Sequence, residues 1–430
     1  MRANRIQANL GRSLFCLFSS FLFSVSIALV LALPPAAAGA AAGQTDAPTQ
    51  ASASVAISSG NLVPLNIEVE NWVKPEPGWL YVLDPKPEAG GPGGRVWLID
   101  PETAKVMGSI RTGDHADFAL SPDGSRLYVA SVADADSSEL AVIDTARGVV
   151  LKSGAVGGRA VTDALQPFST MAVSGDGLAL RILIDDPKPE VDSLLLATFD
   201  TRAGEFLPGI VHLGNCGPGR FISYPAADHF DFLCPRTNRI RLIHVDADSR
   251  ELQNYDVSLP WERREGVAEA IEVPGDQEIS IIRGDGAVVK LDPGPQGFSE
   301  TAAHPGLPNR IPPAAWPISP DGSRIYLGYN NDYDRQSDNP FYLHYGRPPN
   351  VRPENSLVYE FRVLDTHTWQ KIGSIRTKLP FWSAVTGNDG KTLYAMAPQK
   401  HSILVIDTVK LRQIRTLKVG GTPTLALVAP

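Results

Sequence analysis

Residues that could perform acid–base, nucleophilic or metal chemistry are spread along this chain without a known catalytic motif. The eight histidines are scattered, and none has the His-Glu-x-x-His or i,i+4 spacing of a zinc site. The Gly-x-Ser-x-Gly turn of a serine hydrolase and the glycine–lysine loop that binds nucleotide phosphates are also missing. We therefore expect no catalytic residue, no metal ligand and no cofactor-binding residue in this chain.

Cysteine usage points to an oxidising compartment. Of three cysteines, Cys16 lies in an N-terminal segment that we expect to be removed, which leaves Cys216 and Cys234. A pair in an exported chain favours a disulfide bond, with two buried free thiols as the alternative. A lone pair without histidines at ligand spacing is no zinc site. A bridge that closes a loop of this size would stabilise the fold by about 3 kcal/mol.

The N-terminal segment is typical of a targeting sequence. Arg2, Arg5 and Arg12 precede an apolar stretch over residues 14–33, and small residues follow. We predict a signal peptide over residues 1–42, cleaved near residues 38–42, and a disordered leader over residues 43–61. An uncleaved membrane anchor is the alternative, because the apolar stretch is long enough to span a bilayer.

Net charge argues against one class of partner. The formal net charge is −8, and removal of the three N-terminal arginines makes the mature chain more acidic still. Because an acidic surface is repelled by phosphate backbones, we do not expect nucleic-acid binding.

The elements that must position any site are revealed by a repeat. Seven short apolar runs end in aspartate, at steps of 44, 56, 46, 46, 73 and 42 residues: Asp100, Asp144, Asp200, Asp246, Asp292, Asp365 and Asp407. A period in the forties made of strands and turns predicts a β-propeller. We interpret each aspartate as bonding to its own turn rather than as a catalytic set.

A second repeated element gives the register of the strands. Ser121-Pro122-Asp123-Gly124-Ser125-Arg126 recurs as residues 319–324, and weaker copies begin at Ser174 and Gly387. Asp-Gly supplies a turn with positive φ, and a strand follows. One copy is missing near residue 430, whereas a matching strand stands at residues 77–84. We predict an all-β, seven-bladed β-propeller over residues 62–430, whose ring is closed by the N-terminal strand joining the C-terminal blade.

The longest repeat step contains a candidate recognition segment. Most of the excess lies in residues 329–356, which hold five aromatic residues. A long insertion on a rigid scaffold is a common place for recognition, and Tyr and Phe suit interfaces. The candidate partner contacts are Tyr333, Phe341, Tyr342 and Tyr345, and a loop packed on its own blade is the alternative.

Four stretches resemble a known family. They are residues 81–85, the segment from Cys216 to Cys234, residues 324–329 with the acidic, Arg-containing loop that follows, and residues 363–368. Together they resemble the large subunit of the quinoprotein amine dehydrogenases, which act on methylamine or aromatic amines in the bacterial periplasm. The resemblance extends over residues 62–430, and the position of the cysteine pair is its most specific part.

The resemblance implies a large, cofactor-free subunit in a periplasmic α2β2 assembly. A small subunit, rich in disulfides, would bear tryptophan tryptophylquinone. The quinone would oxidise a primary amine to an aldehyde and ammonia, and a blue copper protein would accept the electrons. Two mature cysteines are too few for the quinone-bearing chain itself. After signal cleavage, no contact with a membrane is expected.

One residue departs from the pattern of this family. Methylamine-oxidising relatives have a Phe in the substrate channel, shortly after the Asp-Pro turn, and the matching place here holds Glu88. A carboxylate there would attract an ammonium substrate, so Glu88 is the candidate substrate-channel residue. Two other readings stay open: a stand-alone periplasmic propeller that acts as a binding or scaffold protein, and an enzyme with its own metal site in the central channel.

Overall fold

The computed structural model of this protein describes the strands of the predicted repeat region and most of the short turns between them. The described residues are 67–85, 94–113, 115–133, 137–156, 158, 160, 170–185, 193–209, 211–215, 220–222, 229–236, 239–246, 252–257, 267–273, 279–283, 288–294, 297–304, 317–329 and 358–430. The predicted signal peptide and leader lie outside them.

The described strands form seven antiparallel sheets. The first sheet has the order β1-β4-β3-β2-β29 and contains β1 (Val69–Glu70), β2 (Leu80–Asp84), β3 (Arg95–Asp100), β4 (Lys105–Arg111) and β29 (Leu425–Val428). The second sheet contains β5 (Ala116–Leu120), β6 (Arg126–Val132), β7 (Ser138–Asp144) and β8 (Val149–Val156).

The third and fourth sheets follow in chain order. The third contains β9 (Met171–Val173), β10 (Ala179–Asp185), β11 (Ser193–Asp200), β12 (Glu205–Phe206) and β13 (Val211–Asn215). The fourth contains β14 (Arg220–Ile222), β15 (His229–Arg236), β16 (Arg239–Asp246) and β17 (Leu252–Val257).

The last three sheets repeat the plan. The fifth contains β18 (Val267–Glu272), β19 (Ile279–Arg283), β20 (Val288–Gly294) and β21 (Gly297–His304). The sixth contains β22 (Arg324–Tyr329), β23 (Val358–Asp365) and β24 (Lys371–Phe381). The seventh contains β25 (Ser383–Thr386), β26 (Thr392–Ala397), β27 (Ser402–Asp407) and β28 (Arg412–Lys418), with a 3₁₀ turn, η3 (Pro398–Lys400), before β27.

Each apolar run that the sequence ends with aspartate becomes the same strand of its sheet. These strands are β3, β7, β11, β16, β20, β23 and β27, and each pairs with a strand on both sides. Where these strands' side chains are described, they alternate between two neighbouring sheets, so both faces are apolar and the run is nearly continuous. The described part of the chain is therefore all-β and propeller-like, built from repeated antiparallel sheets of about four strands.

Neighbouring sheets pack face to face through shared hydrophobic clusters. Tyr81 and Leu98 of the first sheet pack with Phe118 and Val129 of the second. The second and third sheets share a cluster, as do the third and fourth and the sixth and seventh. Leu80 and its neighbours in β2 and β3 pack against β26 and β27 of the seventh sheet.

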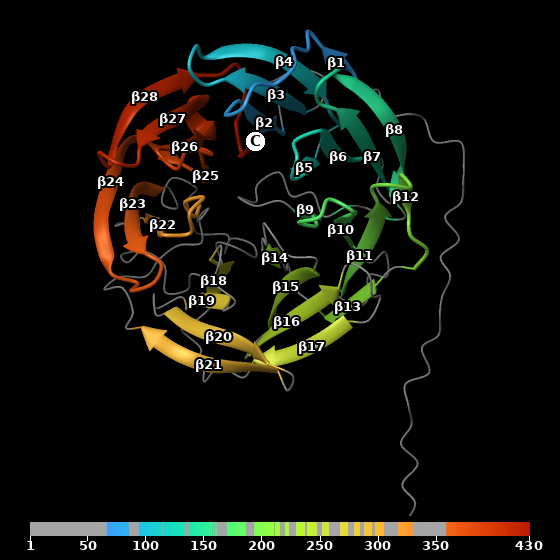
Figure 1. Cartoon of the computed structure of the whole chain (residues 1–430). Helices are drawn as coiled ribbons and strands as arrows, with labels where there is room; N and C mark the ends of the chain where they lie inside the picture. The colour runs from blue at the N-terminus through green and yellow to red at the C-terminus, as the bar shows by residue number, and fades with distance from the viewer. Residues whose placement is uncertain are drawn as a thin grey trace, which may run out of the picture. The chain divides into compact units, whose positions relative to one another are not determined.

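The first sheet is completed from both ends of the described chain, and the structure corrects our expectation of how. β29 pairs with β2, with Leu80 opposite Val428 and Leu83 opposite Leu425, and the C-terminal end of the chain lies beside β2 (Figure 1). We expected the N-terminal strand to join the last sheet; instead the C-terminal strand joins the first. The reason is local: β2 forms a hairpin with β3, and β25–β28 already complete the seventh sheet.

Candidate functional site

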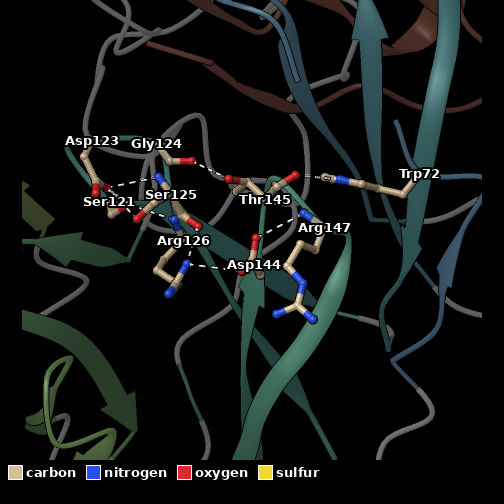
Figure 2. Close-up of polar contacts among 9 residues, drawn as sticks. All are labelled: Trp72, Ser121, Asp123, Gly124, Ser125, Arg126, Asp144, Thr145 and Arg147. Carbon is tan, nitrogen blue, oxygen red and sulfur yellow. Dashed lines mark hydrogen bonds and ion pairs between the residues drawn. The ribbon is translucent and has the colours of Figure 1, made fainter. Parts of the chain in front are cut away.

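The repeated Ser-Pro-Asp-Gly segments build one end of the sheets, which we call the turn end. In the second sheet, Ser121 Oγ donates to Asp123 Oδ1 at 2.6 Å, and the Ser125 amide donates to the same oxygen at 3.0 Å. The Arg126 amide then donates to Ser121 Oγ at 2.9 Å. Asp123 thus lies at the centre of its own turn (Figure 2).

A threonine links this turn to the next hairpin of the same sheet. Thr145 Oγ1 donates to the Gly124 carbonyl at 2.6 Å, while the Arg147 amide bonds to Asp144 Oδ1 at 3.0 Å (Figure 2). The threonine-to-glycine bond recurs at 2.5, 2.5 and 2.7 Å in three further sheets. The donors there are Thr201, Thr366 and Thr408.

The strand-end aspartates are structural where they are described. A backbone amide two or three residues further on donates to the carboxylate of each of Asp100, Asp144, Asp200, Asp365 and Asp407. This confirms our interpretation of them as turn residues. The hydroxyl of Ser121 holds the pKa of Asp123 below its ordinary value, and Ser319 does the same for Asp321. Carboxylates held ionised in this way do not suit proton donation.

Buried tyrosines connect the turn ends of neighbouring sheets. Burial raises the pKa of Tyr81 in the first sheet, and a contact with Thr145 of the second sheet partly offsets this rise. Burial likewise raises the pKa of Tyr128 in the second sheet, and a contact with Thr201 of the third sheet partly offsets this rise. Each tyrosine thus brings a phenol to the threonine of the following sheet, which links the turn ends of the first, second and third sheets.

The turn ends of four sheets adjoin one another directly. In the second sheet, a Cβ on Gly124 would lie 2.5 Å from Pro430 Cγ of the first. Asn388 of the seventh sheet donates to the Ala429 carbonyl at 2.6 Å. Thr386 of the seventh sheet donates to the Ile318 carbonyl, beside the sixth-sheet turn, at 2.8 Å. Sheets six, seven, one and two therefore share one orientation.

That shared orientation defines the opposite, or loop, end of the sheets. Residues 86–93 connect β2 to β3, and residues 330–357 connect β22 to β23, which is the same step of the repeat. Glu88 falls in the first connection, and Tyr333, Phe341, Tyr342 and Tyr345 fall in the second. These residues lie outside the described part of the chain, but the strands that flank them emerge at the same end of their sheets.

A polar cluster on described residues borders the first of these connections. Asp84, the last residue of β2, is fully buried. Its Oδ1 accepts the Thr422 amide at 3.1 Å, and its Oδ2 accepts the Trp97 indole N–H at 3.3 Å. The Arg95 guanidinium lies 5.4 Å from the centre of the Trp97 ring. A carboxylate held by fixed donors anchors the backbone from which residues 86–93 depart.

The backbone at Gly421 passes very close to the Asp84 carboxylate. A Cβ on Gly421 would lie 1.7 Å from Asp84 Oδ2, so only glycine lets the 419–424 segment pass over the carboxylate. Sequence reasoning missed both residues as a site. The available signal was that Asp84 ends β2, the strand that precedes β3, whereas the seven repeated aspartates end β3 and its equivalents in the other sheets.

The predicted disulfide stays a prediction. Cys216 lies outside the described residues, and Cys234 lies in β15, whose backbone alone is described there. Arg220, four residues after Cys216, pairs with Leu233, which precedes Cys234. The chain therefore returns past β15 shortly after Cys216.

The described residues contain no group of three or more His, Cys, Asp or Glu side chains that could hold a metal ion. No helix in the same residues is long and apolar enough to cross a bilayer.

Comparisons with known proteins give information on the fold of this chain and not on its activity. No family model and no curated protein sequence matches this chain. A 6-phosphogluconolactonase candidate from Bacteroides uniformis is similar in structure, with TM-score 0.55 and 12% identity over 82% of this chain and 99% of that chain. Hydrazine synthase from Kuenenia stuttgartiensis has TM-score 0.52 and 16% identity over 73% and 89% of the two chains.

A third similar structure is longer than this chain. Dihydro-heme d1 dehydrogenase NirN has TM-score 0.48 and 15% identity, with 81% of this chain aligned to 65% of that protein's length. Identities this low show the fold alone. The comparisons therefore agree with an all-β, propeller-like chain and leave its activity to be proposed.

Proposed function

We propose that this chain is the large, cofactor-free subunit of a periplasmic amine dehydrogenase, folded as a closed seven-bladed β-propeller. A small subunit bearing tryptophan tryptophylquinone would oxidise a primary amine to an aldehyde and ammonia. A blue copper protein would accept the electrons. This role is what the sequence resemblance implies.

One observation carries the proposal. Two of the stretches that resemble the family, residues 81–85 and 324–329, form β2 and β22, which are equivalent strands of their sheets. Each leads at the loop end into one of the connections that hold Glu88 or the aromatic segment. A channel residue and a partner-contact segment on one end of a rigid scaffold suit a subunit that positions a reactive neighbour.

In this role the chain's residues would act by position. Asp84, held by Trp97 and Thr422, would fix the start of the connection that carries Glu88. Glu88 would attract the ammonium group of the substrate. The aromatic segment would cover the quinone and exclude water from it. No bond is made or broken on this chain in the proposed scheme.

The first experiment is purification of the tagged chain from the periplasm of its native host. A small, cysteine-rich partner with quinone absorbance should co-elute, and a primary amine should bleach that absorbance. A monomer without quinone absorbance would reject the dehydrogenase role. Such a monomer would instead favour the stand-alone binding or scaffold protein, which the aromatic segment and Glu88 would serve equally well.

Variants then test the residues that give the proposal its geometry. Glu88→Gln should raise KM for the amine roughly 5-fold with kcat unchanged, because it removes attraction that the substrate feels before the reaction. Glu102→Gln, at an exposed position on the turn end, is the control. Tyr342→Ser should weaken subunit association roughly 10-fold, whereas Tyr359→Ser, on the exposed part of β23, should not.

A further inference from the structure

The outer edge of the first sheet is covered by an extra strand. Residues 67–73, which we call the strap, place β1 against β4, with Val69 opposite Ile110 and Glu70 opposite Ser109. The Arg111 amide donates to the Glu68 carbonyl at 2.8 Å, and the Val73 amide donates to the Met107 carbonyl at 3.0 Å. The strap thus follows β4 along its length by strand addition.

Among the strands that the structure describes, the outer strands of the other sheets have no such cover. In the described residues, β8, β17, β21, β24 and β28 end their sheets without a further strand. Val149, Val150 and Leu151 at the start of β8 are 38–45% exposed. The β4 edge has specific features that accept an extra strand.

The first specific feature is a groove that accepts an indole ring. Gly108 of β4 and Gly148 of the second sheet have no side chains, and Trp72 fills the space beside both. A Cβ on Gly148 would lie 2.3 Å from the Trp72 ring, and a Cβ on Gly108 would lie 3.0 Å from it. The ring stacks on Tyr81 at 6.2 Å between centroids.

The indole nitrogen adds a directed hydrogen bond in this groove. Trp72 Nε1 donates to the Thr145 carbonyl at 2.7 Å (Figure 2). Thr145 belongs to the second sheet, so one side chain of the strap bridges two sheets. Only Trp combines this apolar area with an N–H donor at the far edge of the ring.

The second specific feature is a pair of arginines that face the strap's carboxylates. Arg95 Nη1 lies 2.6 Å from Glu70 Oε2, and Arg111 Nη2 lies 2.8 Å from Glu70 Oε1. Ser109 Oγ donates to the same carboxylate at 3.1 Å, and Arg111 also pairs with Glu68 at 3.1 Å. The hydrogen bond from Arg95 is the main reason that the pKa of Glu70 is lowered.

We propose that the β4 edge is a strand-binding site for an acidic, Trp-bearing extended peptide, occupied here by the chain's own strap as an exchangeable ligand. The two arginines select the glutamates, and the Gly108–Gly148 groove selects the indole two residues after Glu70. Release of the strap would uncover the joint between the first and second sheets. This inference is independent of the proposed enzyme role.

The test uses the full chain with a site-specific protease sequence inserted between Lys74 and Pro75, both outside the strap. After cleavage, the N-terminal fragment should stay bound at micromolar concentration in gel filtration. A dye-labelled synthetic peptide with residues 64–74 should then displace it, as measured by fluorescence anisotropy. Immediate loss of the fragment would overturn the site, and retention without exchange by excess peptide would overturn its exchangeable character.

Peptide variants test the recognition chemistry without any risk of unfolding the protein. Trp72→Ala in the peptide should weaken displacement about 30-fold, through lost apolar burial and the lost N–H donor. Glu70→Gln should weaken it about 10-fold, and added salt should reduce that difference. Val73→Ala, at a position that is 44% exposed, should change it less than about 3-fold. Equal affinity of all four peptides would refute the assigned selectivity.

Discussion

The first and second sheets build the same turn in two ways. In the second sheet, residues 121–126 form it within one continuous segment, where the Gly124 amide donates to the Ser121 carbonyl at 2.8 Å. In the first sheet, the Gly78 amide donates to the Ala429 carbonyl at 2.8 Å, across segments that are remote in sequence. Ala429 and Pro430 thus take the places of Ser121 and Pro122.

The split turn keeps the contacts that a continuous turn makes with its neighbour. Pro122 lies 3.6 Å from a Cβ built on Gly177 of the third sheet, and Pro430 lies against Gly124 in the equivalent place. What the split turn lacks is the central carboxylate that Asp123 provides. The first sheet adds other fixed points instead, namely the Asp84 contacts at the loop end and the strap along its outer edge.

The largest expected effect tests the loop-end contact of the first sheet. Gly421→Ala should lower the free energy of unfolding by about 3 kcal/mol, because its Cβ would overlap the Asp84 carboxylate and the segment would have to move. Gly420→Ala, with no atom within 4 Å of its Cβ, should change stability by less than about 0.5 kcal/mol. Urea unfolding measures the free energy of unfolding of both variants. Similar losses would show that the Asp84 carboxylate does not hold the 419–424 segment in place.

A pair of turn glycines tests whether Pro430 truly replaces a turn proline. Gly124 and Gly177 both have positive φ, at 70° and 74°, so alanine at either costs about 1 kcal/mol from backbone strain. Gly124→Ala should lose about a further 1 kcal/mol, because its Cβ would lie 2.5 Å from Pro430. Thermal and urea unfolding of the two variants measure the difference in their loss of stability. Equal losses would contradict the role of Pro430 as a replacement for a turn proline.

A smaller effect is expected from the bond between the seventh sheet and the split turn. Asn388→Ala removes the 2.6 Å hydrogen bond to the Ala429 carbonyl and should lower stability by about 1 kcal/mol. The Gly78 amide still bonds to that carbonyl, which limits the loss. Lys391→Ala, on the same turn at its exposed side, is the control. Hydrogen exchange at Gly78 should quicken in the first variant alone.

The smallest effect distinguishes the two turns by pH. Asp123 has a lowered pKa, chiefly through Ser121, so its stabilising effect is present above its ordinary value of 3.8 and is lost as pH falls through the lowered value. The Ser125 amide, which bonds to Asp123, should lose protection in acid relative to its intrinsic exchange rate. The Gly78 amide of the split turn has no carboxylate partner and should not. Parallel loss at both would contradict the distinction.

Local sequence determined the repeated elements of this protein. The Asp-Gly turns, the Ser121-type hydroxyls and the apolar runs ending in aspartate act over a few residues, so their pattern predicts strands, turns and an all-β fold. The interpretation of the strand-end aspartates as turn residues was correct for the same reason at the five positions whose side chains are described. Glu88, the aromatic segment and the cysteine pair were chosen by composition and resemblance, and they stay predictions.

Tertiary structure alone decided how the first sheet is completed and what surrounds it. Thr422 reaches Asp84 across 338 residues, Trp72 reaches Thr145 across 73, and β29 rather than the N-terminal strand changes sheets. Contacts of this kind depend on which faces meet after the sheets have packed. The local conformational preferences of Asp84, Trp72 and Gly421 do not specify these contacts. Each of these residue types is compatible with many surroundings, and only the packing of the sheets brings its partner close.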